Sequence, residues 1–300
     1  MKMIANRIVL LISYADIFLY PVTEQYLRLW FFGKKVSEEQ IHRACVSLIK
    51  RKKIQKKGDY YILAGRTHII APALYRQRAS IEKWEYLSKK LWIIRWIPTI
   101  ECIGVSGGLA WNNAGKNDDI DLFVITSSHT LWSTRAMITL VLETFGIRRR
   151  PKEKMIKNKV CLNMFLSRDV LTLPPDMRSW FVAFEVLQFT PLWQRNNTYQ
   201  TFLQANHWVK KWFPAQWDER KVLDVPSIQS NCIYPRIFSL CEPCIHAVSL
   251  RYMKLKRTTE RVEKGLAQFH PRDARIWIYD KWKKRLTHLH IPLDKKIFAP

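Results

Sequence analysis

Two aspartates spaced two residues apart, behind a glycine pair, are the residues of this chain best placed to do chemistry. Gly107 and Gly108 follow the apolar run 100–105, and Asp119-Ile120-Asp121 opens a second apolar run that ends at Thr126. In a strand, residues two apart point to the same face, so Asp119 and Asp121 are expected to project together. Neighbouring carboxylates repel each other and are costly to desolvate unless a cation lies between them. Such oxygen ligands suit Mg²⁺, which takes one or two carboxylates together with substrate phosphates.

The glycine pair has a second chemical use. A residue without Cβ lets the backbone turn tightly and bring its N–H groups against a phosphate. Either a glycine pair or an Asp-x-Asp alone is more often structural, because glycine pairs commonly mark ordinary turns. Together, with residues 109–118 as the spacer and apolar flanks on both sides, they indicate a site for a phosphorylated substrate and a divalent cation.

This arrangement resembles the nucleotidyltransferase superfamily typified by DNA polymerase β. The family signature is a glycine followed by Gly or Ser, a spacer, and Asp-x-Asp in a strand; Gly107-Gly108 and Asp119-x-Asp121 match it. The resemblance covers roughly residues 98–170 and implies a mixed sheet with helices packed on it. More loosely, the chain is similar to bacterial or archaeal proteins in which such a domain follows a winged helix.

The resemblance implies a role for each residue of the motif. Asp119 and Asp121 would bind Mg²⁺, or Mn²⁺ in its place, and the backbone of Gly107 and Gly108 would hold the β- and γ-phosphates of an NTP. Ser106 would add a hydroxyl hydrogen bond and Lys116 a screening charge, unless this spacer lysine is simply solvated. The spacer also carries two asparagines that either contact sugar or phosphate or only shape the loop, Asn112 and Asn113.

The chain departs from the family at the third metal-binding carboxylate. That carboxylate normally comes from a later strand, and the strand expected over 159–166 offers Asn163. An amide oxygen can ligate a cation but brings no charge and cannot act as a base. Asp169, just after the strand, and Glu185, on the helix expected over 178–190, are the alternatives. Both also have ordinary interpretations, as a turn residue and as a helix residue.

The elements before this motif predict a winged-helix-like domain over residues 1–70. Helices are expected over 5–19, over 23–32 and from the capping-box sequence at Ser37 to Lys50, followed by a hairpin that turns at Lys57-Gly58-Asp59. Basic residues lie on the third helix, directly after it and in the hairpin. They are candidates for phosphate contacts with nucleic acid or for a merely solvated face: Arg43, Lys50, Arg51, Lys52, Lys53, Lys56 and Lys57.

The rest of the chain divides into three further parts. Residues 71–97 are expected to form a helical connector, with a long helical pattern over 73–96, and 98–175 the nucleotidyltransferase core with a helix over 129–145. Residues 176–300 are expected to be helical, including a final helix over 271–288. The predicted class is therefore α+β. His270, before a proline, receives no role.

Composition limits the partners and the compartment. Lys and Arg number 50 against 25 acidic residues, a net charge of +25, which favours nucleic acid, nucleotides or anionic membranes. Six scattered cysteines do not form a disulfide framework, and no apolar run is long enough for a membrane span, so a cytoplasmic protein is expected. Cys241-x-x-Cys244 with His246 has no second ligand pair, so buried helical thiols are expected there in preference to zinc.

The predicted activity is Mg²⁺-dependent transfer of a nucleotidyl group from an NTP to an unidentified acceptor. The alternative is a regulator without catalysis, which senses a nucleotide through a degraded site or binds nucleic acid. A carboxylate from Asp169 or Glu185 within metal reach of Asp119 would favour the enzyme, and an empty position would favour the sensor.

Overall fold

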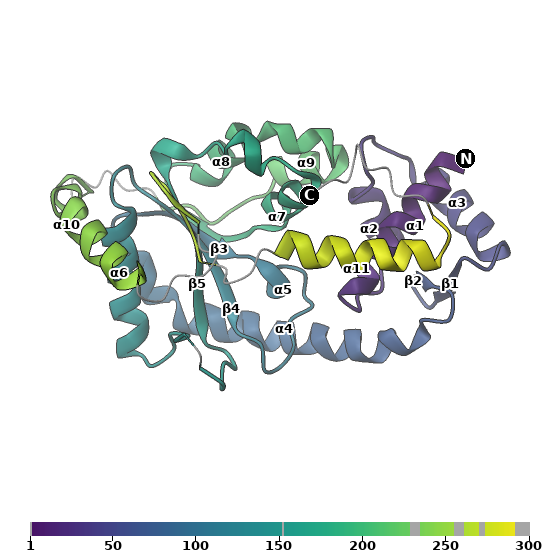
Figure 1. Ribbon diagram of the computed structural model, residues 1–300, viewed down its shortest axis with the longest axis horizontal. Coiled ribbons are helices and arrows are strands. Elements are labelled where there is room, and N and C mark those ends of the chain that lie inside the picture. The colour runs from purple at the N-terminus through teal and green to yellow at the C-terminus, as the bar shows by residue number, and fades with distance from the viewer. Residues whose placement is uncertain (1, 152, 229–234, 255–260, 270–273, 292–300) are drawn as a thin grey trace.

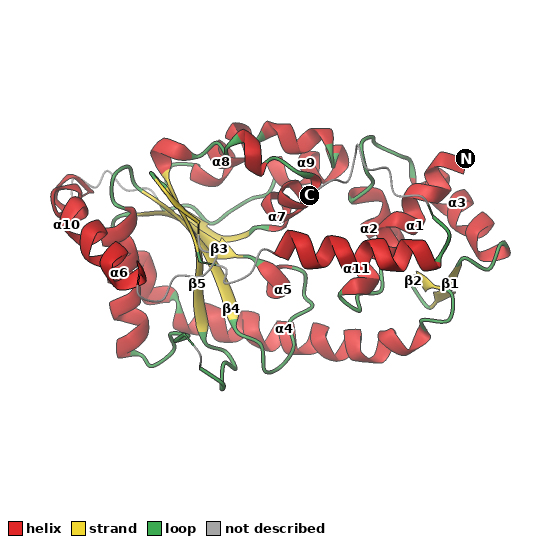
Figure 2. Cartoon of the chain, in the orientation of Figure 1, coloured by secondary structure: helices red, strands yellow, loops and turns green. Residues whose placement is uncertain are grey.

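The computed structural model describes residues 2–151, 153–228, 235–254, 261–269 and 274–291. Within these ranges the chain is α+β, as expected: a mixed six-stranded sheet carries helices on both faces, and a separate two-stranded hairpin lies among the N-terminal helices (Figure 1, Figure 2). None of the helices in these ranges combines the length and the apolarity that crossing a membrane requires.

The N-terminal part contains three helices and a hairpin, in the expected order. They are α1 (Lys2–Ile17), α2 (Glu24–Leu29), α3 (Glu38–Lys50), β1 (Ile54–Lys57) and β2 (Tyr60–Leu63). The capping box at the start of α3 is present, because Ser37 Oγ accepts from the Gln40 backbone and Gln40 Oε1 accepts from the Ser37 backbone. Gly58 turns the hairpin with φ +58°, a conformation that glycine adopts without strain. Val22 pairs with Tyr61 as an isolated antiparallel bridge beside the hairpin.

A long helix joins this part to the central sheet. Helix α4 (Ile70–Lys90) runs along one side of the molecule from the N-terminal helices to the sheet (Figure 1). The continuous helical pattern expected over 73–96 is interrupted, since the chain tightens into a 3-10 helix over Trp92–Trp96. The other 3-10 turns are Thr67–Ile69, Arg168–Val170, Pro175–Met177 and His207–Lys211.

The sheet has the order β6-β3-β4-β5-β8-β7, in which only β4 and β5 run parallel. Its strands are β3 (Ile100–Val105), β4 (Ile120–Thr126), β5 (Val160–Ser167), β6 (Thr190–Gln194), β7 (Arg261–Glu263) and β8 (Leu266–Gln268). In the sequence, α5 (Gly107–Ala110) lies between β3 and β4, and α6 (Leu131–Thr144) lies between β4 and β5. The region 176–300, which was expected to be helical, contains helices but also supplies three strands of the sheet, β6, β7 and β8. Strand β6 approaches so closely that a Cβ on Gly104 would lie 2.4 Å from the Thr190 carbonyl oxygen.

Each face of the sheet has its own hydrophobic core. Leu122 and Val124 pack with α4 and α6 on one face. Phe123 and Ile125 lie in the other core, under α7 (Trp180–Gln188), α8 (Thr198–Ala205) and α9 (Pro214–Lys221). Because side chains alternate along a strand, Asp121 shares the second face with Phe123.

The last two described helices pack against different parts of the molecule. Helix α10 (Pro235–Lys254) lies against α6, whereas α11 (Ala274–His288) returns to α1 (Figure 1). In α11, the fully buried Trp282 donates its indole N–H to Ser13 Oγ at 2.9 Å, and Arg285 pairs with the buried Asp16 at 3.0 Å. His270 lies outside the described residues.

Candidate functional site

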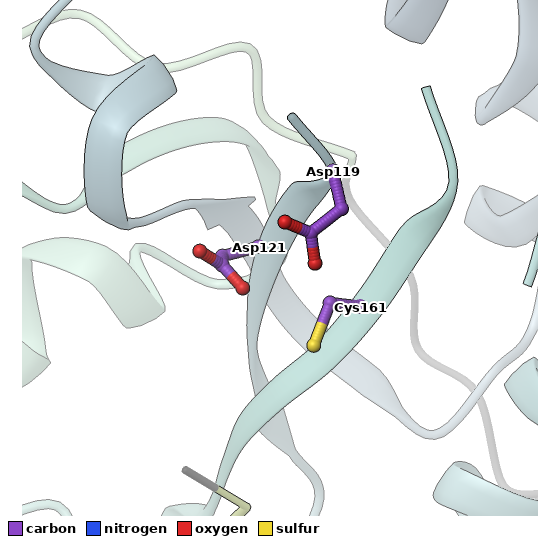
Figure 3. Close-up of side chains that lie close together, drawn as sticks. All are labelled: Asp119, Asp121 and Cys161. Carbon is purple, nitrogen blue, oxygen red and sulfur yellow. The ribbon is translucent and has the colours of Figure 1, made fainter. Parts of the chain in front are cut away.

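The two aspartates of the motif lie together, as the spacing predicts, and a cysteine joins them. Asp119 directly precedes β4, and Asp121 is paired in register with Cys161 on β5. One ligand atom from each of the three residues lies within 4.8 Å of the others (Figure 3). Among the described residues, this is the one place where three His, Cys, Asp or Glu ligand atoms gather so closely.

Burial and the short distance between the two carboxyl groups disfavour their ionised forms. Burial, reinforced by the Asp119 carboxylate, raises the pKa of Asp121 from its ordinary 3.8 to about 7, although Cys161 and Arg149 act in the opposite direction. Burial and the same two carboxylates raise the pKa of the Cys161 thiol well above its usual range. Arg149 forms an ion pair with Asp119. The Arg149 guanidinium therefore balances the Asp119 carboxylate, and the raised pKa of Asp121 favours a proton on the Asp121 carboxyl below about pH 7.

The glycine turn lies directly against Asp121. A Cβ on Gly107 would lie 2.7 Å from Asp121 Oδ2, and Gly107 has φ +64°, so both space and backbone conformation demand glycine there. The Ser106 N–H donates to the Asp121 carbonyl at 3.0 Å. Ser106 Oγ accepts from the Asn163 amide at 3.2 Å. Gly108 is exposed, and its backbone is accessible beside the turn.

A buried lysine that sequence analysis did not single out holds the spacer loop. Lys83, on α4, is 2% exposed and donates to the backbone carbonyls of Lys116 (3.2 Å) and Asp118 (2.7 Å) and to Asn158 Oδ1 (2.8 Å). Burial lowers the pKa of this ammonium, and the nearby Asp118 and Asp119 charges oppose that shift. The Lys116 side chain is exposed. Nothing in the sequence marks Lys83, because it is one of many basic residues in a helical stretch.

The asparagines of the spacer shape the loop. Asn112 Oδ1 accepts from the Trp84 indole on α4 at 3.0 Å, and Asn113 Nδ2 donates to the Phe18 carbonyl at 3.0 Å. Between the glycine turn and these contacts, Trp111 packs against Tyr14 and Phe18 of the N-terminal part, with ring centroids 6.2 and 5.5 Å away. The loop that carries the candidate site is thus fixed to both α4 and the N-terminal helices.

The position beside Asp121 belongs to Cys161 and not to the expected Asn163. The register shifts between Leu122 and Phe123, which pair with Leu162 and Met164, so Asn163 is the extra residue of a β-bulge. Its amide faces Ser106 and is 8% exposed. A bulge depends on the pairing of two strands, and the sequence of one strand does not reveal it.

Neither alternative carboxylate completes the cluster. Asp169 follows Ser167, which pairs with Thr126 at the far end of the parallel strands. Ser167 lies six residues beyond Cys161, the partner of Asp121, and at about 3.3 Å per residue this is roughly 20 Å along β5. The Asp169 carboxylate instead contacts Ser167 and lies 3.8 Å from His129 Nδ1. Glu185, on α7, is exposed and lines a neighbouring cavity but is not part of the cluster.

The donor set fits a hard divalent cation in part. Two carboxylates are enough for Mg²⁺ or Mn²⁺ when substrate phosphates supply further oxygens. A protonated thiol is not a ligand for Mg²⁺, because such hard cations take oxygen donors. Arg149 pairs with Oδ2 of Asp119, so a cation either binds the other oxygen of this carboxylate or displaces the guanidinium.

A cavity of about 240 Å³ adjoins the cluster. It begins at Ser106 and Gly107 and extends between α7 and the face of β4 and β5 that carries Phe123 and Met164. The wall is mainly apolar. The cavity and the carboxylates therefore share the same face of the sheet, separated only by the glycine turn.

The remaining candidates from the sequence, the cysteine pair of α10 and the basic residues around α3, lie outside the carboxylate cluster. Cys241 and Cys244 lie in α10 as expected, but both are exposed and not buried, and His246 stacks on Trp132 with a ring separation of 5.0 Å. The basic residues after α3 are exposed, as are those of the hairpin. On α3 itself, Arg43 lies 3.6 Å from Glu39, so this helix face carries both signs of charge.

No protein-family model, curated protein or solved structure matches this chain.

Proposed function

We propose that this protein is a Mg²⁺-dependent nucleotidyltransferase that moves a nucleotidyl group from an NTP to an acceptor. The observation that carries the proposal is the pairing of Asp119 and Asp121 directly against Gly107, whose absent Cβ leaves room for the Asp121 carboxylate. Two carboxylates beside an exposed glycine turn match a cation that is shared with phosphate oxygens.

The residues would divide the work as follows. Asp119 and Asp121 would hold Mg²⁺ or Mn²⁺, an ion that neutralises phosphate charge and lowers the pKa of an acceptor hydroxyl. Gly107 and Gly108 would bind the β- and γ-phosphates through backbone N–H groups, and Ser106 would hold the turn in place. Lys116 would screen phosphate charge from the exposed side of the loop.

In the reaction, the acceptor oxygen forms a bond to the α-phosphorus, and the bond from that phosphorus to the leaving oxygen breaks. Pyrophosphate leaves, and the acceptor proton passes to solvent. Such transfers need positioning and charge stabilisation more than covalent help. Lys83 and the asparagines serve positioning by fixing the loop between Gly108 and Asp119.

The proposal extends to the fold and the partners. Strands β3, β4 and β5 with α6 would form a polymerase-β-like core, and α1, α2, α3 and the hairpin would form a winged helix that binds nucleic acid through its exposed basic residues. All described cysteines are free thiols, which supports a cytoplasmic location.

A non-catalytic nucleotide sensor is the second candidate, and Cys161 favours it. The thiol occupies the position beside Asp121 where a third carboxylate would complete the metal site. A sensor would bind Mg²⁺ and NTP without transferring the nucleotidyl group.

Binding and transfer, measured on the same variants, separate these candidates. Purified protein is titrated with Mg²⁺ and NTP by calorimetry, and is incubated with α-phosphate-labelled NTPs and cell extract before mass spectrometry. Asp119→Asn and Asp121→Asn should abolish both. Asp118→Asn is the matched control, because this exposed carboxylate of the same loop contacts the Gly115 N–H, and an amide oxygen can accept the same bond.

The enzyme is supported if the Asp121→Asn variant loses nucleotidyl transfer while the Asp118→Asn variant keeps it. Binding without transfer identifies the sensor. Retention of transfer when both Asp119 and Asp121 are replaced would refute the proposed site.

A further inference from the structure

The cavity beside the glycine turn is lined by a side chain that has an unpaired hydrogen-bond donor. Gln188, the last residue of α7, lines the cavity and is 7% exposed. Its Nε2 is buried and has no hydrogen-bond partner among the described residues. A buried donor without an acceptor is costly, and such groups in native proteins call for an explanation. A rotation of the side chain that turns this amide toward a ligand in the cavity would give the donor an acceptor.

The sheet places Gln188 close to the candidate phosphate site. Thr190, two residues further on, pairs with Val105, and Val105 directly precedes Ser106. On the neighbouring strand, Phe123 lines the cavity and lies two residues beyond Asp121 on the same face. A ligand whose phosphates lie at the glycine turn can therefore extend into the cavity and contact Gln188.

The shape and the lining of the cavity define the ligand class. Its walls include the side chains of Phe123, Met164, Phe181 and Phe202, which favour a flat group with apolar faces. Glu185, Arg261 and Arg275 also line the cavity, so a ligand with polar atoms on its edge finds charged partners there. Its volume of about 240 Å³ is slightly below that of pockets for drug-sized ligands, which begin at about 300 Å³. A ring system with hydrogen-bonding atoms only on its edge fits these conditions.

We propose that this cavity receives the base of the bound NTP and that the Gln188 amide hydrogen-bonds to the edge of that base. An amide offers a donor and an acceptor side by side and can pair with two edge atoms of one base. The proposal rests on the proposed function, because it takes the phosphates to lie at the glycine turn. Gln188 thereby becomes a specificity-determining residue, and the protein prefers some bases over others.

The test compares NTPs with a ligand that has no base. The full chain with Mg²⁺ is titrated with ATP, GTP, CTP, UTP and inorganic tripolyphosphate. At least one NTP should bind about 10-fold more tightly than tripolyphosphate. Gln188→Leu should remove about 10-fold of that NTP affinity, the size expected for one hydrogen bond, and leave tripolyphosphate affinity unchanged.

Two further variants guard against a general loss of folding. Gln188→Glu keeps the side-chain volume and replaces the donor with a charged acceptor, so it should change the order of preference among the four NTPs. Gln216→Leu is the matched control, because Gln216 on α9 is 6% exposed, has a buried unpartnered amide oxygen and does not line the cavity. It should leave all five affinities unchanged.

The outcomes separate this proposal from the proposed function. If tripolyphosphate binds in an Asp121-dependent way but no NTP binds more tightly, the site holds phosphate and the base does not enter the cavity, which overturns the proposal alone. Equal losses in the Gln188→Leu and Gln216→Leu variants would also overturn it. Failure of every triphosphate to bind would refute the proposed function itself.

Discussion

Replacing Asp121 with asparagine should stabilise the protein, and the gain should depend on pH. In the folded protein, burial and the Asp119 charge raise the pKa of this carboxyl from 3.8 to about 7. One pKa unit corresponds to about 1.4 kcal/mol, so the ionised carboxylate destabilises the folded state by up to about 4 kcal/mol. The side chain is half-buried and not sealed from solvent, which brings the expected value to about 2–4 kcal/mol.

The sign follows from the protons that each state binds. Between pH 4 and pH 7 the folded state keeps the Asp121 proton while the unfolded state loses it. The unfolding free energy contributed by this group is therefore complete below about pH 4, falls as pH rises, and levels off above about pH 7. The asparagine side chain of the variant does not titrate, so the variant should match the wild type near pH 4 and exceed its stability at pH 8.

Urea unfolding in the presence of a chelator measures the difference directly. Curves for the wild type, Asp121→Asn and the control Asp118→Asn are collected at pH 4.5, 6 and 8 and fitted with a common m-value. Titrating groups that do not interact with Asp121 cancel in the difference between wild type and variant, so the difference reports Asp121 together with its neighbours in the cluster. A difference that stays constant from pH 4.5 to pH 8, or a variant that is less stable at pH 8, would show that Asp121 ionises normally and that the strained carboxylate pair does not exist.

Three other predictions concern the metal, the loop and the basic surface. Cys161→Asp should tighten Mg²⁺ binding in calorimetry more than Asn163→Asp does, because residue 161 lies beside Asp121; a stronger effect at 163 would contradict this register. Lys83→Met should destabilise the fold by about 1–2 kcal/mol, since it removes the donor of three partly buried hydrogen bonds. It should also speed backbone hydrogen exchange in the spacer loop, and unchanged exchange there would refute the positioning role. Reversal of Arg51 and Lys53 to glutamate should weaken duplex DNA binding in fluorescence anisotropy and lower the log–log slope of affinity against salt by about 0.9 per lost phosphate contact. Reversal of Lys89 and Lys90, two exposed lysines at the end of α4, should not. Equal effects of the two reversals would show that the surface after α3 makes no particular contacts with DNA.

The sequence was sufficient to predict the relations that depend on local periodicity. Asp119 and Asp121 lie together because strand residues alternate, and the capping box and the Gly58 turn follow from short-range chemistry. The partner of Asp121 was not predictable in this way, because the bulge at Asn163 decides which β5 residue lies beside it. The three-residue strands β7 and β8 were missed because so short a segment has no periodicity, and the adjoining strand β5 determines their position.

The packing of α11 on α1 has a consequence for how the chain is made. Trp282 and Ser13 are 269 residues apart, and at roughly 5–20 residues per second the ribosome needs on the order of 10–60 s to supply the second after the first. During that interval α1 can pack against α3 and β2, but the part of its apolar surface that α11 covers stays exposed to solvent or to a chaperone. Nascent chains stalled before residue 274 should therefore be cut by protease within α1 more readily than the released protein. Synthesis of the last helix, and not of the first domain, would then be the step that completes the N-terminal core.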